Sequence, residues 1–252
     1  MRNPNEHVDQ RNPFAVTATM GEVAAYAEDS ERIGFIRKTY AHLTGAILAL
    51  IALEAVLFTV VPAATMQGLV QTMTSGYGWL IVLGAFMGVS WIATMWANSG
   101  TSRSMQYAGL GLYVVAEAVI LLPLLYICIT LLKEPQLPLM AAVITGMCFI
   151  GLTAFVFTTR VDLEGWGKYL AIVGIVAMCA IAAGIFTGFS LGIWFSAIMV
   201  AFAAGTILYQ TSNVLHHYHT SQYVAASLAL FASVVLLFWY VLQILMAFSS
   251  ND

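Results

Sequence analysis

Seven long apolar runs occupy most of the chain between Tyr40 and Phe248, near residues 40–61, 78–98, 105–130, 137–159, 168–188, 191–210 and 222–248. Each run supplies about the 20 apolar residues that a helix needs to cross the hydrocarbon core of a bilayer. Because 61% of the residues are hydrophobic and only 8% are charged, the chain lacks the polar surface of a soluble domain. The sequence therefore predicts an all-α membrane protein, a bundle of seven transmembrane helices.

The positive charges predict how this bundle is oriented in the membrane. Eight of the nine Lys and Arg residues fall before the first run or in alternate connections on one side, namely Arg2, Arg11, Arg32, Arg37, Lys38, Arg103, Arg160 and Lys168. Only Lys133 falls on the other side. Positively charged connections stay in the cytoplasm, so we expect a cytoplasmic amino terminus and a carboxyl terminus outside.

The chain divides into a polar tail and one membrane domain. Residues 1–34 form the predicted cytoplasmic tail, which has no apolar segment of a cleavable signal peptide. A short interfacial helix is expected near residues 21–38. Residues 35–248 form the predicted seven-span domain.

Two acidic side chains lie inside the apolar runs, Glu54 and Glu117. An acid at bilayer depth costs several kcal/mol unless it is protonated, paired or in contact with water, so each is a functional candidate. At 1.5 Å per residue, Glu54 lies roughly 20–23 Å and Glu117 roughly 18 Å from the inner ends of their spans. At such similar depths they can share a proton or hold a cation such as calcium. Alternatively, each stays protonated and hydrogen-bonded to a neighbouring span.

Small residues recur at four-residue spacing in several runs. Examples are Gly84 and Gly88 in the second run and Ala197, Ala201 and Gly205 in the sixth. This spacing allows helix backbones to approach closely in lipid, so it predicts helix contacts at these positions.

Four segments resemble successive blocks of the Bax inhibitor family of seven-span membrane proteins. They are FIRKTYAHLTGAILAL at 35–50, LTAFVFTTRVDLEGWGKYL at 152–170, GTILYQTSNVL at 205–215 and YVAASLALFASVVLLFWYVLQIL at 223–245. The most specific pieces are the turn Thr158, Thr159, Arg160, Asp162 and Leu163, and the end of the sixth run at Leu208, Tyr209 and Thr211. The chain is identified as a divergent, bacterial-type member. The resemblance implies six helices around a central seventh, and an association with calcium leak controlled by pH.

The chain departs from the family at two positions that matter for that mechanism. Well-studied members carry an aspartate in the sixth span and another in the seventh, which form a proton-sensitive latch. This chain has Gln210 and Ser233 there. Neither side chain ionises, so the latch cannot be carried over, although an amide and a hydroxyl can still hydrogen-bond. Any pH dependence is then expected to come from Glu54, Glu117 or the turn with His216, His217 and His219.

Other motifs give little support for catalysis or bound cofactors. The three histidines have no Cys or acid within a few residues to complete a zinc site, so no metal or other cofactor is expected. Asp162 is predicted to accept from free backbone amides at the start of the fifth span, and Arg160 to hold the cytoplasmic interface. Gly188-Phe189-Ser190-Leu191-Gly192 matches a hydrolase motif literally, but Ser190 lies at the outer turn and the histidines lie inside. We therefore expect no enzyme.

Two hypotheses for function remain open. The first is a passive pathway for calcium or protons that uses Glu54 and Glu117. The second is a non-transporting regulator that binds another membrane protein, such as a protease. The expected partners are the lipid bilayer, calcium ions in the first hypothesis and a membrane protein in the second, with no nucleic acid.

The charge pattern makes a direct prediction about topology. A reporter fused after Asp252 should appear outside the cytoplasm, and one fused before Arg2 should appear inside, because seven spans put the two termini on opposite sides. Activity of cytoplasmic and external reporters measures both. Finding both fusions on one side would contradict seven complete spans.

Overall fold

The computed structural model describes residues 23–74, 77–100 and 102–249. Its helices are α1 (Asp29–Val60), α2 (Ala63–Thr74), α3 (Gly78–Ala97), α4 (Arg103–Tyr126), α5 (Leu137–Thr159), α6 (Gly167–Thr187), α7 (Gly192–His216) and α8 (Tyr223–Ser249). A π-helix, Ile127–Leu131, continues α4, and a 3-10 helix, Glu164–Trp166, precedes α6. Residues 1–22 of the predicted tail lie outside the described residues.

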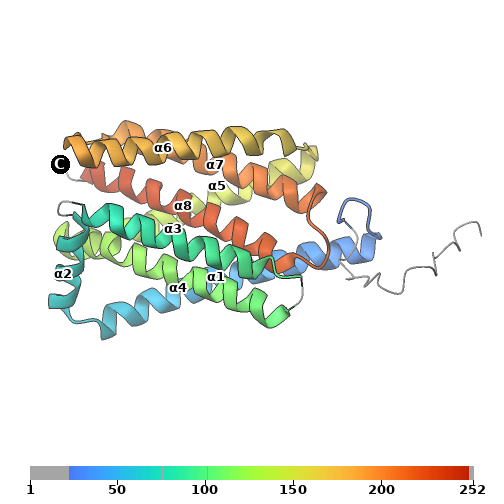
Figure 1. The fold of residues 1–252 in the computed structure, drawn as a ribbon, viewed down its shortest axis with the longest axis horizontal. Coiled ribbons are helices and arrows are strands. Elements are labelled where there is room, and N and C mark those ends of the chain that lie inside the picture. The colour runs from blue at the N-terminus through green and yellow to red at the C-terminus, as the bar shows by residue number, and fades with distance from the viewer. Residues whose placement is uncertain (1–22, 75–76, 101, 250–252) are drawn as a thin grey trace, which may run out of the picture.

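All helices except α2 are long and apolar enough to cross a membrane, which confirms the seven predicted spans. Figure 1 shows them side by side, with successive spans running in opposite directions. The bundle thus has an amino-terminal end, where α1 begins, and a carboxyl-terminal end, where α8 finishes. The α7–α8 turn lies at the amino-terminal end, where the amide of Ala24 donates to the carbonyl of Tyr218 at 2.9 Å.

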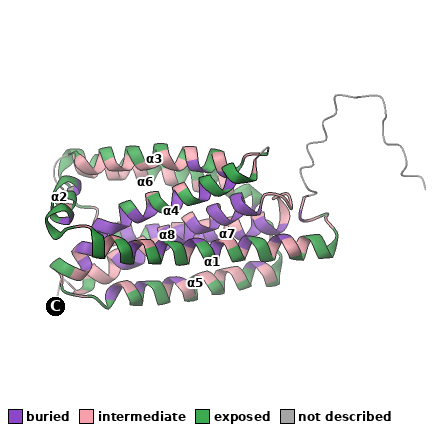
Figure 2. Ribbon diagram, turned by 90° about the horizontal axis from the view of Figure 1, so that it is seen from below, coloured by how far each residue is buried: buried purple, intermediate pink, exposed green. Residues whose placement is uncertain are grey.

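Helix α8 occupies the centre of the bundle. It packs against α1, α3, α4, α5 and α7, whereas α6 packs chiefly against α7. In both α4 and α8, 56% of the apolar window is buried, against 11% in α3 and α6. Figure 2 shows the same contrast, because the buried colour gathers on α8, α4 and α7. The expected arrangement of outer helices around the seventh span therefore agrees with the fold.

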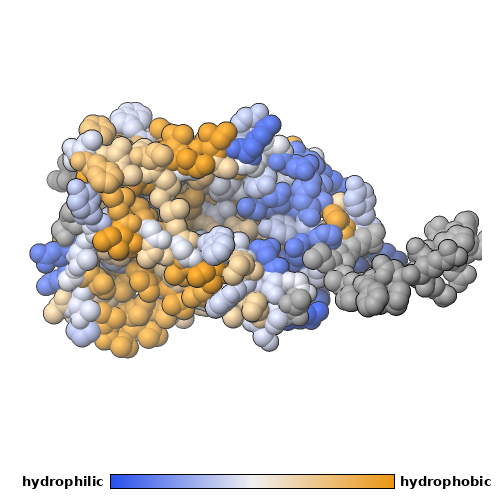
Figure 3. Space-filling view, viewed as in Figure 1, coloured by the Kyte–Doolittle hydropathy of each residue, from blue (hydrophilic) through white to orange (hydrophobic). Residues whose placement is uncertain are grey.

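The outer helices present large apolar side chains to the surroundings. Ile81, Trp91, Ile150 and Trp194 are each exposed by two thirds or more of their surface. Figure 3 shows hydrophobic residues over much of the bundle and polar residues gathered toward its amino-terminal end. A surface this apolar requires lipid around it, which fits an integral membrane protein.

Three boundaries differ from those expected. Helix α1 runs without a break from Asp29, so the interfacial helix expected near 21–38 is not a separate element. The connection at 62–77 contains α2, whose Met66 packs against Leu122 and Tyr126. Helix α7 continues to His216, well beyond the predicted end at 210. In all three segments the helical conformation satisfies the backbone hydrogen bonds within the segment itself.

Helices α3 and α4 approach each other closely at Gly109. A β-carbon at this position would lie 2.5 Å from the carbonyl oxygen of Ala93 and 2.6 Å from the amide nitrogen of Ala97. By contrast, β-carbons at Gly84 and Gly88 would meet open space, so the contact predicted there is wrong. At Gly205 a β-carbon would be in ordinary contact with Leu170, at 3.4 Å. Spacing alone cannot tell which face of a helix meets a neighbour.

We expect Gly109→Ala to destabilise the protein by about 1–3 kcal/mol, because the added methyl group would force α3 and α4 apart. Gly111→Ala is the matched control, since its β-carbon would meet nothing within 4 Å. Alanine is about 1 kcal/mol better than glycine in a helix, so the control should be neutral or slightly stabilising. Thermal unfolding of the two purified variants measures the difference. Equal melting temperatures would contradict the close contact.

Candidate functional site

A cavity of about 1220 Å³ lies between α3, α4, α6, α7 and α8. Its lining extends from the α6–α7 turn, Gly188 to Gly192, at the carboxyl-terminal end to Tyr218 at the amino-terminal end. In the view of Figure 3 it lies between α6 at the top and α3 below. Its polar lining residues are Ser90, Thr94, Asn98, Tyr113, Glu117, Ser190, Ser196, Thr206, Gln210, Tyr218, Ser233, Tyr240 and Gln243. Most of the lining is apolar, but the volume leaves room for many water molecules beside these polar groups, since each water occupies about 30 Å³ in the liquid.

Glu117 contributes the acidic side chain of this cavity. It lies on α4, the more buried of the two helices that carry intramembrane acids, and is only 6% exposed. Tyr113, one turn earlier on the same helix, interacts with the Glu117 carboxyl group. The cavity therefore joins an ionisable group to a polar lining that follows the length of the bundle.

Gln210 and Ser233, the positions of the family's latch, line the same cavity as Glu117. They do not bond to each other. The Ser233 hydroxyl donates to the carbonyl of Ala229 at 3.0 Å, within its own helix. The Gln210 side-chain oxygen accepts from the side-chain nitrogen, Nδ2, of Asn213 at 3.5 Å. The structure thus brings the two positions to one space but without the hydrogen bond that the sequence leaves open.

Glu54 is placed differently. It is 8% exposed on α1 and does not line the cavity. Both of its carboxyl oxygens are buried without a hydrogen-bond partner among the described residues. No hydrogen bond or ion pair in the described part of the chain connects it to Glu117, and of the two acids Glu117 lines the cavity.

The turn between α5 and α6 is fastened to α7 by Ser212. Its hydroxyl accepts from the amide of Leu163 at 2.9 Å and donates to the carbonyl of Val161 at 3.1 Å. Arg160 ends α5 with a left-handed φ of 51°, and its amide donates to the carbonyl of Val156 at 2.8 Å. This reversal of the chain places Asp162 beside the end of α7.

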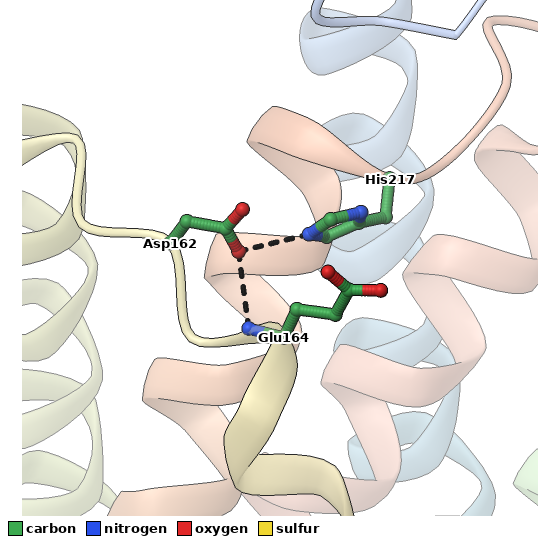
Figure 4. Close-up of side chains that lie close together, drawn as sticks. All are labelled: Asp162, Glu164 and His217. Carbon is green, nitrogen blue, oxygen red and sulfur yellow. Dashed lines mark hydrogen bonds and ion pairs between the residues drawn. The ribbon is translucent and has the colours of Figure 1, made fainter.

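Asp162 makes two hydrogen bonds at this turn (Figure 4). One of its carboxylate oxygens accepts from the Glu164 amide at 3.0 Å and lies 2.9 Å from Nε2 of His217. The predicted acceptor role at the start of the fifth span is therefore present, on the 3-10 helix that precedes α6. The hydrogen bond from His217 lowers the pKa of Asp162 below its usual range.

The three histidines have separate surroundings. Nδ1 of His216 lies 3.0 Å from the carbonyl oxygen of Ser212, within α7. His217 faces Asp162, whereas the backbone amide of His219 donates to the side chain of Gln222 at 3.0 Å. Between His217 and His219, burial raises the pKa of Tyr218 to about 12, so its hydroxyl is a neutral hydrogen-bonding group at this end of the cavity.

The whole membrane domain matches one family. Residues 32–250 match the family described as inhibitor of apoptosis-promoting Bax1. The chain belongs to the Bax inhibitor family. It is 28% identical over 250 residues to Bax inhibitor 1 of Schizosaccharomyces pombe, a match that covers 98% of this chain and 86% of that protein.

Bacterial members of the family are also similar to the chain. An uncharacterized protein of Neisseria meningitidis serogroup A is 26% identical over 179 residues, covering 69% of this chain and 75% of that protein. The modulator of FtsH protease YccA of Escherichia coli K12 is 33% identical over 109 residues, covering 43% of this chain and 49% of that protein.

The two most specific motifs of the Bax inhibitor family meet in the fold. Tyr209 packs so close to Gly167 that a β-carbon on the glycine would lie 2.6 Å from the tyrosine hydroxyl oxygen. Ser212, three residues later, holds the turn that contains Asp162. Segments about fifty residues apart therefore form one structural unit at the amino-terminal end.

Sequence reasoning missed several features of this region. The cavity depends on the spacing of five helices, which no local pattern reports. The only sequence signal for Ser212 is its place in the segment 205–215 that resembles the family. Asp162 and Glu164 are more than fifty residues from His217 in the sequence. A search for acids within a few residues of the histidines therefore does not find the two acids that lie near His217 in the fold.

We expect Asp162→Asn to lower the melting temperature slightly near neutral pH, because it removes the charge of a carboxylate that accepts hydrogen bonds from His217 and the Glu164 amide, and exposed pairs contribute only about 0.2–1 kcal/mol. The pKa of Asp162 is lower in the folded protein than in the unfolded chain. The ionised carboxylate therefore stabilises the folded protein at pH values above the ordinary aspartate pKa, about 3.9, and this stabilisation is lost as the pH falls through the folded-state pKa. Melting temperatures of both proteins between pH 3 and 7 measure this. A difference that does not shrink at low pH would contradict the assignment.

Proposed function

We propose that this protein provides a passive pathway for cations, protons or calcium, through the cavity that Glu117 lines. The observation that carries the proposal is the position of Glu117 in the wall of a cavity that follows most of the length of the bundle and has polar side chains along it. An acid in the middle of a membrane domain is rare and is most often found where ions or protons pass.

Oxygen ligands for a cation are available along this path. Ser90, Glu117 and Ser233 line the cavity, and Thr206 and Gln210 of α7 belong to the same lining. Hard cations such as calcium bind carboxylate, carbonyl and hydroxyl oxygens and exchange them for water. Several weak sites in series favour passage, because tight binding at one site would hold the ion.

We assign Glu54 no direct part in this pathway. Its carboxyl oxygens are buried away from the cavity and have no hydrogen-bond partner in the described residues. Glu54 is therefore a matched comparison for Glu117: an acid of the same type, at a similar depth, outside the lining.

The second candidate is a regulatory function on a membrane protease. It is favoured by the similarity to the modulator of FtsH protease YccA, which covers 43% of this chain. The two candidates differ in what they require of the purified protein. A regulator should co-purify with a protease and show no flux, whereas a pathway should conduct without a partner.

The central experiment measures calcium and proton flux into liposomes that contain the purified protein. We expect Glu117→Gln to lower the flux about tenfold or more, because the amide cannot carry a charge or a proton, and a tenfold change in rate corresponds to only about 1.4 kcal/mol. Glu54→Gln should retain most of the flux. Equal losses in both variants, or no flux in the unchanged protein, would contradict the pathway through this cavity.

A further inference from the structure

The turn between α5 and α6 and the end of α7 bring together three side chains of the kinds that bind metal ions. They are Asp162, Glu164 and His217, and each has a ligand atom within 4.8 Å of the others. Figure 4 shows all three pointing into the same space. We propose that they form a binding site for a divalent transition-metal cation of the zinc type, which joins the turn to α7.

Two of the ligand atoms are already close enough to share an ion. Nε2 of His217 lies 2.9 Å from Oδ1 of Asp162. A zinc ion binds nitrogen and oxygen donors at about 2.0–2.2 Å, so donors on a tetrahedral ion lie roughly 3–4 Å apart. The third donor, the Glu164 carboxylate, is exposed and makes no hydrogen bond to the described residues, so a change of rotamer brings it within reach.

The backbone that carries these ligands is held in place independently of any ion. Ser212 bonds to both Val161 and Leu163, the two neighbours of Asp162. The Glu164 amide donates to Asp162, and His217 follows directly after α7, with its own amide bonded to the carbonyl of Asn213 at 2.9 Å. A site that is ordered before binding loses less conformational entropy when the ion arrives.

The combination of ligands selects the class of metal. Carboxylates alone favour calcium or magnesium, but an imidazole nitrogen favours zinc and its neighbours in the periodic table. Three protein ligands on an exposed turn also leave a fourth position for water. We therefore expect this turn to bind zinc more tightly than calcium.

Binding would act on α7, the helix that also lines the cavity. His217 lies seven residues, or about two helical turns, beyond Gln210. An ion shared between His217 and the α5–α6 turn would fix the carboxyl-terminal end of α7, which lies at the amino-terminal end of the bundle, against its neighbours. This inference does not depend on ion movement through the cavity, and the experiment below can fail while the flux experiment succeeds.

The test is calorimetric titration of zinc chloride and calcium chloride into the purified full-length protein after removal of metals with a chelator. We expect one zinc ion per chain, and a loss of zinc affinity of about tenfold or more in Glu164→Gln and in His217→Ala, because each removes one of three ligands. Glu134→Gln and His219→Ala are the matched controls, since neither side chain belongs to the cluster. Both should bind zinc as the unchanged protein does.

Glu164→Gln keeps the test valid if other variants fold poorly, because within residues 23–74, 77–100 and 102–249 the Glu164 side chain makes no hydrogen bond that the substitution would remove. Its melting temperature without metal should equal that of the unchanged protein, and only the stabilisation by zinc should be lost. Zinc binding that survives in both ligand variants would overturn the proposal. Calcium binding at the same turn as tightly as zinc would overturn the class of metal.

Discussion

The burial of α8 among the other spans is the constraint on which the rest of the structure depends. In lipid the backbone must satisfy its hydrogen bonds within each helix. The arrangement of the helices is therefore determined mainly by how closely they pack against one another. Helix α8 packs against five of them, and the largest fully buried side chains include its Phe231, Leu230, Leu237 and Leu242. Helix α6 approaches this centre chiefly through α7, which leaves space between α6 and α3. The cavity is a consequence of that uneven packing.

The same packing explains why Glu117 and Glu54 differ although both are buried acids. Glu117 lies on α4 and lines the cavity, together with polar side chains from α3, α7 and α8. Glu54 lies on α1, away from the cavity, where its carboxyl oxygens find no partner among the described residues. Their depths along the spans predict two acids at one level of the membrane, but only the arrangement of the helices decides which one meets a polar space.

The sequence predicts the fold well and the site only in part. Long apolar runs specify seven helices, because each crossing needs a fixed length of apolar chain. Family resemblance predicts the central seventh helix. Contacts between helices are harder to predict from the sequence. Gly84 and Gly88 have the spacing of a contact, but β-carbons there would meet open space, whereas Gly109 lies against α3. The facing of a helix depends on its partners, which no single run reveals.

The candidate site shows the same division. Glu117, Gln210 and Ser233 were all identifiable from the sequence, but their common cavity was not, because it is formed by five helices. Similarly, the cluster of Asp162, Glu164 and His217 joins positions more than fifty residues apart in the chain. Ser212 makes this possible by fastening the turn to α7. Such contacts follow from the way in which α5, α6 and α7 pack.

The central claim is that Ser233, Gln210 and Glu117 face one water-filled cavity, and labelling of introduced cysteines tests it most directly. In a protein whose Cys128, Cys148 and Cys179 are replaced by alanine, Ser233→Cys should react with a small, charged thiol reagent. Ser227→Cys, on the same helix but fully buried and outside the cavity, should not react. If cysteine at 233 proves as unreactive as cysteine at 227, the cavity holds no accessible water and the account of Glu117 is wrong.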